Sequence, residues 1–124
     1  MTREEVHRLL GPPQRQFRRG SEKYLTDFYT DVGVFVYYGD DDELVEAIEF
    51  CDPASVMLQG RDLMAMPYTE VEAWLKRHDS SVVFDGDGIT CEALGVGVYA
   101  PSALESPQDL PEGVIVFPKG YYEE

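Results

Sequence analysis

The sequence contains few of the residues on which catalysis and metal binding most often depend. Only two histidines and two cysteines occur among its 124 residues. His7 and His78 stand in no H-E-x-x-H, H-x-x-H or Cys-His pattern, so neither marks a metal site or the base of an activated nucleophile. We interpret His7 as a surface residue and His78 as a cation at the end of a helix. We therefore predict a protein that is not an enzyme, with no catalytic residue, no metal site and no cofactor.

Glycine-rich phosphate loops are absent as well. Gly86 and Gly88 alternate with aspartates, which would repel a phosphate, and Gly95-Val96-Gly97 lacks the following helix that such a loop requires. The acidic turns at 40–43 and 85–88 hold enough oxygen atoms to bind calcium loosely, but neither follows the ligand spacing of an EF-hand. We expect solvated hairpin turns at both places.

Long hydrophobic runs are missing too. No apolar stretch approaches the ~20 residues of a membrane span, and the opening MTREE is charged in both signs and leads into no signal-peptide run. We expect a cytoplasmic protein with no membrane partner. Cys51 and Cys91 lie far apart and form no C-x-x-C pair, so we expect buried reduced thiols, with a single disulfide as the alternative in another compartment. Spacing gives no support to Cys51 as a nucleophile with His78 as its base.

Basic residues are scarce outside the first part of the chain. The formal net charge is −14, yet residues 1–23 carry six basic and three acidic residues, so residues 24–124 carry −17. A field of this sign repels nucleic acid and attracts a basic protein surface, although the same acidity would also serve solubility alone. The length fits a single domain, residues 1–124, and the 44% hydrophobic content is that of a folded globule.

Two short helices are predicted by capping boxes, in which a threonine and a glutamate three residues later cap the first turn. In the first, Thr2 and Glu5 form the box, and the apolar face is Val6, Leu9 and Leu10 before Gly11-Pro12-Pro13 ends the helix.

The second helix repeats this pattern later in the chain. Thr69 and Glu72 form its box, and Val71, Trp74 and Leu75 form its buried stripe. Basic residues at 76–78 suit the negative end of the helix dipole.

After each helix the sequence changes to β-branched and aromatic runs separated by turn residues. The predicted strands cover 16–19, 23–29, 32–38 and 44–50 after the first helix, and 81–84, 89–93, 95–100 and 114–117 after the second. A proline-rich segment, 102–112, is the longest predicted loop. We therefore predict an α+β fold, an antiparallel sheet with two short helices on one face, with two helix-plus-meander halves as one arrangement of it.

The opening MTREEVHRLLGPP resembles the helix followed by Gly-x-Pro of small bacterial domains of the SmpA/OmlA type and of the β-lactamase inhibitory protein. In the latter, tandem halves each place a helical hairpin against an antiparallel sheet. A small acidic α+β chain without a catalytic motif is also similar in profile to bacterial toxin-immunity proteins. This likeness implies that the chain binds a toxin and blocks it.

Aromatic and acidic residues adjoin one another at two places, which is a common composition of interface hot spots. We predict that these residues bind a partner: Tyr37, Tyr38, Asp40, Asp41, Asp42 and Glu43 in the segment 37–43, and Tyr121 and Tyr122 near the C-terminus. The tyrosine pair at 37–38 would act as an anchor if exposed. In the alternative interpretation alternate tyrosines face the core, the acids form a solvated turn and the last four residues are frayed.

The leading hypothesis is therefore a non-catalytic acidic protein-binding module, most concretely an immunity protein that occludes a basic toxin without binding nucleic acid or membrane. A structural or regulatory domain and a small-ligand-binding domain are the alternatives.

Overall fold

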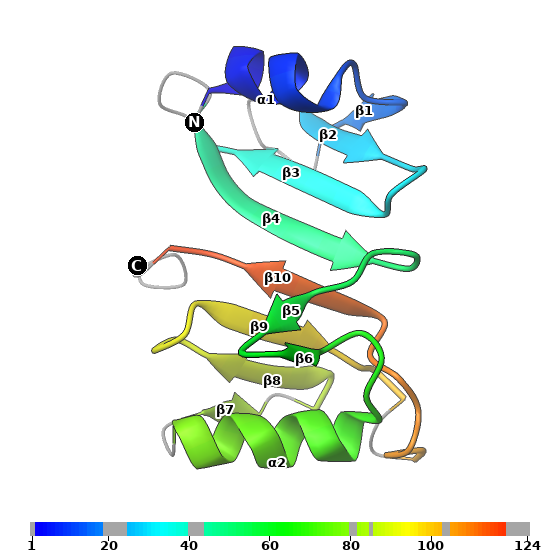
Figure 1. The fold of residues 1–124 in the computed structure, drawn as a ribbon, viewed down its shortest axis with the longest axis vertical. Coiled ribbons are helices and arrows are strands. Elements are labelled where there is room, and N and C mark those ends of the chain that lie inside the picture. Colours follow the sequence, from blue (N-terminus) through cyan, green and yellow to red (C-terminus); the bar gives the residue numbers. More distant parts are fainter. Residues whose placement is uncertain are drawn as a thin grey trace.

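Eight strands form one continuous antiparallel sheet in a computed structural model of the chain, which describes residues 2–18, 25–39, 44–79, 82–84, 86–102 and 105–118 (Figure 1). The strand order is β1-β2-β3-β4-β10-β9-β8-β7. The strands are β1 (Arg15–Phe17), β2 (Thr26–Tyr29), β3 (Val34–Tyr38), β4 (Val45–Cys51), β7 (Val83–Phe84), β8 (Gly88–Cys91), β9 (Val96–Tyr99) and β10 (Gly113–Val116).

Each run of consecutive strands is a meander, and the two meanders meet at the centre of the sheet. There β4 pairs antiparallel with β10, with Phe50 opposite Val114 and Ile48 opposite Val116. Every predicted strand is present with its ends shifted by a few residues, and the α+β class with an antiparallel sheet is confirmed.

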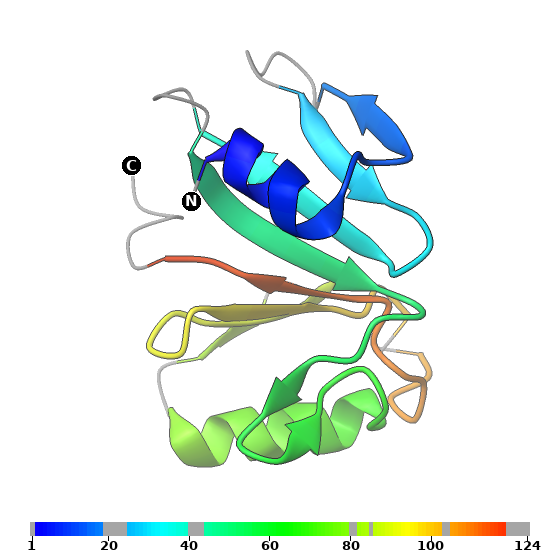
Figure 2. The same cartoon turned by 45° about the horizontal axis from the view of Figure 1, so that its top comes forward.

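Helix α1 (Arg3–Leu10) begins with the predicted capping box, in which the Thr2 side chain and the Glu5 side chain each bond the other residue's backbone amide. The predicted apolar face is wrong in part. Val6 is buried against β2 and β3, but Leu9 and Leu10 are 69% and 54% exposed. The helix is short and lies across β2 and β3 (Figure 2), where one apolar side chain and a group of polar contacts hold it.

Helix α2 (Tyr68–His78) buries the predicted stripe of Val71, Trp74 and Leu75, but the predicted capping box is wrong. The helix begins two residues earlier than the predicted box requires, with Pro67 as its N-cap and no side-chain cap. Its first amides bond a distant loop instead: the Tyr68 amide donates to the Asp109 carbonyl at 2.8 Å, and the Thr69 amide to the Pro107 carbonyl at 3.0 Å. The predicted loop at 102–112 therefore supplies the cap, because its carbonyls satisfy the donors that a threonine would otherwise serve.

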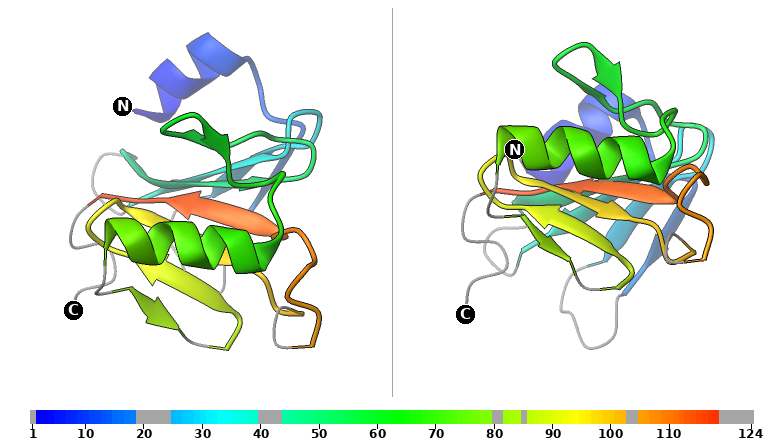
Figure 3. Two further views of the ribbon diagram at one scale, coloured as in Figure 1. Left: turned by 60° about the horizontal axis from the view of Figure 1, so that its bottom comes forward. Right: turned by 90° about the horizontal axis from the view of Figure 1, so that it is seen from below.

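A small hairpin, β5 (Met57–Leu58) and β6 (Arg61–Asp62), lies next to α2 and was not predicted (Figure 3). Its turn residues Gln59 and Gly60 have φ of 50° and 83°, as the tightest hairpin turns require. The Asp62 carboxylate accepts the Val56 and Met64 amides at 3.1 and 3.0 Å, and these bonds lower its pKa.

The main core lies between α2, this hairpin segment and strands β8, β9 and β10. Within the residues that the structure describes, no helix is long and apolar enough to cross a membrane.

Candidate functional site

The two sides of the sheet differ in what packs on them. In an antiparallel pair, residues directly opposite one another project to the same side. One such row belongs to two hydrophobic clusters, one with Trp74 and Leu75 of α2 and the other with Val6 of α1. This row consists of Ile89, Val98, Val114, Phe50, Val34 and Tyr29. The adjacent row projects to the other side, which we call the open face; it consists of Thr90, Gly97, Ile115, Glu49, Phe35 and Phe28.

Aromatic rings cover the open face over β1, β2 and β3. Phe28 and Phe35 stack with ring centroids 4.0 Å apart and planes 3° from parallel. Phe17 meets Phe35 edge-on at 6.1 Å, and Tyr37 stacks beside Phe35 at 6.3 Å. We call these four residues the aromatic ladder. Such pairs each contribute about 0.5–1.5 kcal/mol beyond burial, so the ladder is a stiff surface on which Phe17, Phe28 and Phe35 are half-buried.

The predicted tyrosine anchors both lie inside the fold. Tyr37 is 5% exposed and donates its hydroxyl to Glu49 Oε1 at 2.8 Å on the open face. Tyr38 is 4% exposed and projects to the other side, where its hydroxyl reaches Asp27. The exposure on which an anchoring role depends is therefore not met, because both tyrosines are buried, in separate clusters on opposite sides of the sheet.

The other predicted binding residues, Asp40 to Glu43 together with Tyr121 and Tyr122, lie outside the described residues. The structure does describe the base of the 39–44 turn, where the Gly39 amide donates to the Leu44 carbonyl at 2.9 Å. The partner-binding role of these acids and tyrosines stays a prediction.

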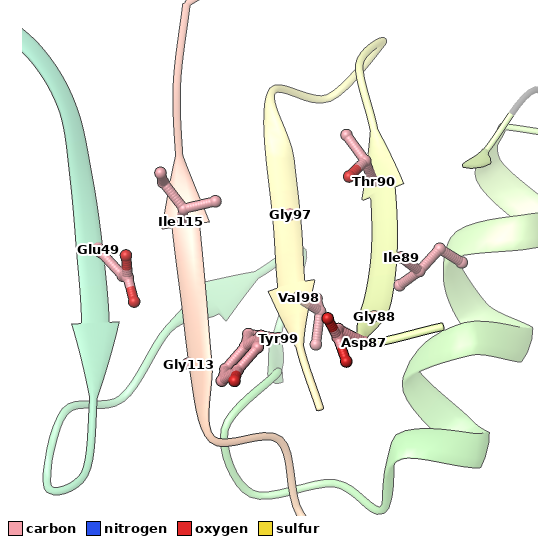
Figure 4. Close-up of a pocket in the computed structure, with 10 residues that line it drawn as sticks. All are labelled: Glu49, Asp87, Gly88, Ile89, Thr90, Gly97, Val98, Tyr99, Gly113 and Ile115. Carbon is pink, nitrogen blue, oxygen red and sulfur yellow. The ribbon is translucent and has the colours of Figure 1, made fainter. Parts of the chain in front are cut away.

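A depression of about 340 Å³ lies on the open face over β4, β10, β9 and β8 (Figure 4). We call it the glycine depression, because three of its lining residues, on neighbouring strands, are glycines. It is lined by Glu49, Asp87, Gly88, Ile89, Thr90, Gly97, Val98, Tyr99, Gly113 and Ile115.

The glycines are required by the close approach of their neighbours. A Cβ on Gly88 would lie 1.8 Å from the Val98 carbonyl oxygen, and one on Gly97 would lie 2.9 Å from the Ile115 side chain. At Gly113 a Cβ would lie 3.4 Å from Glu49 Oε2. Glycine inside a strand often marks such a close approach, and here three of them open one shallow space.

Acceptor groups dominate the polar lining of the depression. The carboxylates of Glu49 and Asp87 stand on its rim, with the hydroxyls of Thr90 and Tyr99 nearby, and no basic residue from the described part of the chain lines it. Tyr99 is 50% exposed and pairs directly with both Gly113 and Gly88, so its ring stands beside two bare stretches of backbone. Carboxylates with an aromatic flank suit a cation.

A second polar cluster lies beneath α1. Asp27, which is fully buried, accepts from Arg3 at 2.8 Å, Gln16 at 2.8 Å and Tyr38 at 2.9 Å, and lies 2.6 Å from His7 Nε2. The interpretation of His7 as a plain surface residue is wrong, because the ring is tied to this buried carboxylate.

This cluster fastens α1 to β2 and β3. The Arg3 guanidinium also stands 4.0 Å above the Tyr38 ring. Burial, and then the bond to Asp27, raise the pKa of Tyr38 well above its ordinary value. Because its donors converge on one carboxylate, we interpret the cluster as structural.

The remaining candidates for chemistry are His78 and the two cysteines, Cys51 and Cys91. His78 ends α2 as predicted, with Nδ1 2.9 Å from the Trp74 carbonyl. Cys51 and Cys91 are free thiols, and burial raises the pKa of each, which disfavours the nucleophilic thiolate. Among the described residues, no group of three or more His, Cys, Asp or Glu side chains could hold a metal ion.

Glu49, Tyr99 and the three phenylalanines of the aromatic ladder were not predicted as site residues. The signal that could have found them is the alternation of the strands that carry them, together with glycines at 88, 97 and 113 within or beside β-branched runs. No protein-family model, no curated protein and no solved structure matches the chain.

Proposed function

We propose that the chain is a non-catalytic acidic module that binds a basic partner protein on the open face of its sheet, most concretely an immunity protein that occludes a basic toxin. The observation that carries the proposal is the composition of this face. A stiff aromatic ladder adjoins Glu49 and an acid-rimmed depression, on a chain of net charge −14. Aromatic anchors supply contact area at low entropic cost, and carboxylates select a cationic partner.

We further infer that both helices share one face of the sheet and that the chain consists of two helix-plus-meander halves. The row that packs against the helices supports this, because Val34 lies beside the cluster of α1 and Val114 belongs to the cluster of α2, with Phe50 between them in register. This arrangement leaves the open face to a partner.

Occlusion needs no chemistry from this chain. Acidic groups would pair with the basic residues that hold the partner's anionic substrate, and the body of the sheet would exclude that substrate by its volume. In this proposal Asp40, Asp41, Asp42 and Glu43 steer the partner and pair with its basic residues. Tyr99, half-exposed on the open face, takes the anchoring role that Tyr37 and Tyr38 cannot fill.

The test uses two exposed aromatic residues on opposite sides of the sheet. Tyr99 is 50% exposed on the open face, whereas Phe84 is 45% exposed and pairs with Ile89 in the row that faces the helices. A partner is first identified by purification from the native cells at low salt, and its Kd is then measured with both proteins pure. We expect Tyr99→Ala to raise Kd at least tenfold and Phe84→Ala to leave it within twofold. Equal Kd values for Tyr99→Ala and the wild type would reject the open face as the docking surface.

A small-ligand-binding domain is the second candidate, and the glycine depression favours it. A small cation that stays bound through purification in the absence of any protein partner would support it instead.

A further inference from the structure

We infer that the glycine depression is the acceptor for one arginine side chain, whose guanidinium pairs with Glu49 while its methylene stem lies over the glycines beside Tyr99. The inference rests on the proposed function, since the arginine would belong to the basic partner. It adds the chemical class of the group recognised and the residues that recognise it.

Glu49 is oriented before any partner arrives. Its Oε1 accepts a hydrogen bond from the Tyr37 hydroxyl at 2.8 Å. Tyr37, on β3, is itself held in place because its side chain packs with Ala47 of β4 and with Phe117. Its Oε2 faces Gly113, at the edge of the depression. A carboxylate has about four acceptor positions, so one bond to Tyr37 fixes the group and leaves capacity for a bidentate donor.

The bare backbone of the depression flanks Tyr99. Gly88 and Gly113 are the direct cross-strand partners of Tyr99, one on each side of it, and Gly97 lies in the adjacent row between Thr90 and Ile115. A Cβ placed on Gly113 would lie 3.4 Å from Glu49 Oε2 and 4.0 Å from the Tyr99 Cβ, so a methylene stem over Gly113 has the carboxylate on one side and the tyrosine on the other. A Cβ at Gly88 or Gly97 would collide with the neighbouring strand, so the absence of side chains there is built into the sheet.

The lining selects arginine among the common cations. A guanidinium is planar, donates in a fork that matches a carboxylate and stacks on aromatic rings, whereas an ammonium is compact and strongly hydrated. Glu49 offers the carboxylate, and Tyr99 offers a half-exposed ring beside it. An anion would meet two carboxylates and no lining basic residue.

Sheet stability alone accounts for only part of this arrangement. An aromatic ring beside strand glycines shields their backbone, which explains Tyr99. Shielding of the glycines does not explain why a carboxylate, that of Glu49, is held by a tyrosine hydroxyl at the rim of the same depression.

The experiment titrates the full chain with a single probe, the blocked tripeptide acetyl-Gly-Arg-Gly-amide, at neutral pH and low salt. Backbone amide signals are followed by NMR. We expect saturable shifts, with Kd in the millimolar range, at Gly88, Gly97 and Gly113. The matched citrulline peptide, which has the same shape without the charge, should give none, and the lysine peptide should bind at least threefold more weakly.

Two glutamates of β4 supply the matched variants. Glu49→Gln should weaken the arginine peptide about tenfold, and Glu46→Gln, on the same strand but not lining the depression, should change it less than twofold. If the NMR spectrum shows that Glu49→Gln does not fold, Tyr99→Leu replaces it in the titration. The comparison with the citrulline peptide uses the wild-type protein and does not depend on any variant. Absence of shifts at the glycines, or equal binding by the lysine or citrulline peptide, would overturn the arginine site.

The two proposals fail in different ways. If the tripeptide does not bind but Tyr99→Ala still weakens the protein partner, the open face docks a protein without an arginine acceptor. If the tripeptide binds but Tyr99→Ala leaves the partner's Kd unchanged, the acceptor stands and the docking surface is elsewhere.

Discussion

The hydroxyl of Tyr38 lies 2.9 Å from Oδ2 of Asp27, a carboxylate with no exposure to solvent. A buried anion is tolerated only when donors surround it, and here Arg3, Gln16 and Tyr38 all donate to it, with His7 in contact. Strands β2 and β3 and helix α1 are therefore joined through one side chain.

The Tyr38–Asp27 bond should make stability fall at high pH. Burial and Asp27 raise the pKa of Tyr38 above its ordinary value of 10.0, so the neutral hydroxyl stabilises the fold below pH 10 and this contribution is lost as pH rises above it. We expect Tyr38→Phe to cost about 1.5 kcal/mol of unfolding free energy at pH 7. The difference from wild type should narrow between pH 10 and 11.5 in urea titrations; a constant difference would contradict the assignment.

Replacing Asp27 should be costly because its donors would lose their acceptor. We expect Asp27→Asn to lower the free energy of unfolding by about 3 kcal/mol, since the amide offers one acceptor oxygen and sets its own donors against Arg3 and Gln16. Asp31→Asn, in the exposed turn after β2, is the control and should change it by less than about 0.5 kcal/mol. Chemical denaturation of both variants makes the comparison, and similar values would mean that Asp27 is not the fastening residue.

The glycines of the depression give a prediction about stability that is independent of any ligand. In Gly88→Ala the new Cβ would meet the Val98 carbonyl oxygen at 1.8 Å, so strands β8 and β9 must separate. We expect a loss of at least about 3 kcal/mol or no folded protein. Gly39→Ala, where the nearest atom lies at 3.9 Å, should keep a thermal midpoint near that of the wild type. A folded, stable Gly88→Ala variant would show that the close approach is absent in solution.

The two predicted helix caps should respond differently to the same substitution. Thr2→Ala removes a formed capping box and should cost about 1 kcal/mol. Thr69→Ala should cost far less, because the first amides of α2 bond the carbonyls of Pro107 and Asp109. Urea denaturation of the two variants gives the ranking, and a larger loss for Thr69→Ala would contradict the loop as the cap.

The acidic turn should control how fast a basic partner arrives. Reversing Asp40, Asp41, Asp42 and Glu43 to lysine should lower kon by at least tenfold at low salt and flatten its dependence on ionic strength. Stopped-flow mixing with the identified partner measures both quantities. Reversal of Glu70 and Glu72 on α2, away from the open face, is the control. An unchanged kon would remove the steering role from the turn.

Local signals in the sequence predicted the elements and missed the contacts between distant segments. The continuous β-branched and aromatic run at 34–38 predicts a strand, and the stripe at 71, 74 and 75 predicts a buried helix face, because both patterns depend only on near neighbours. The prediction of Thr69 as a cap was wrong because carbonyls of a loop some 40 positions later accept hydrogen bonds from the first amides of the helix. The hairpin at 57–62 was missed because two-residue strands carry too little periodicity to detect.

The candidate site, like the fold, depends on contacts between distant segments that local sequence signals do not contain. Tyr37 and Tyr38 drew attention as a pair, yet a strand sends them to opposite sides of the sheet. Glu49 and Tyr99 line one depression only because of the register of β4, β10 and β9, and a short window of sequence does not contain that register.

The pairing of β4 with β10 has a consequence for biosynthesis. Residues 52–112 lie between the two strands in the chain, so the edge of β4 that β10 covers has no neighbour until β10 itself has left the ribosome. During that interval the free backbone donors and acceptors of this edge can recruit a strand from another nascent chain. Premature termination just before Gly113 would leave two half-sheets with open edges, so β10 protects the growing protein from aggregation as well as joining its two meanders.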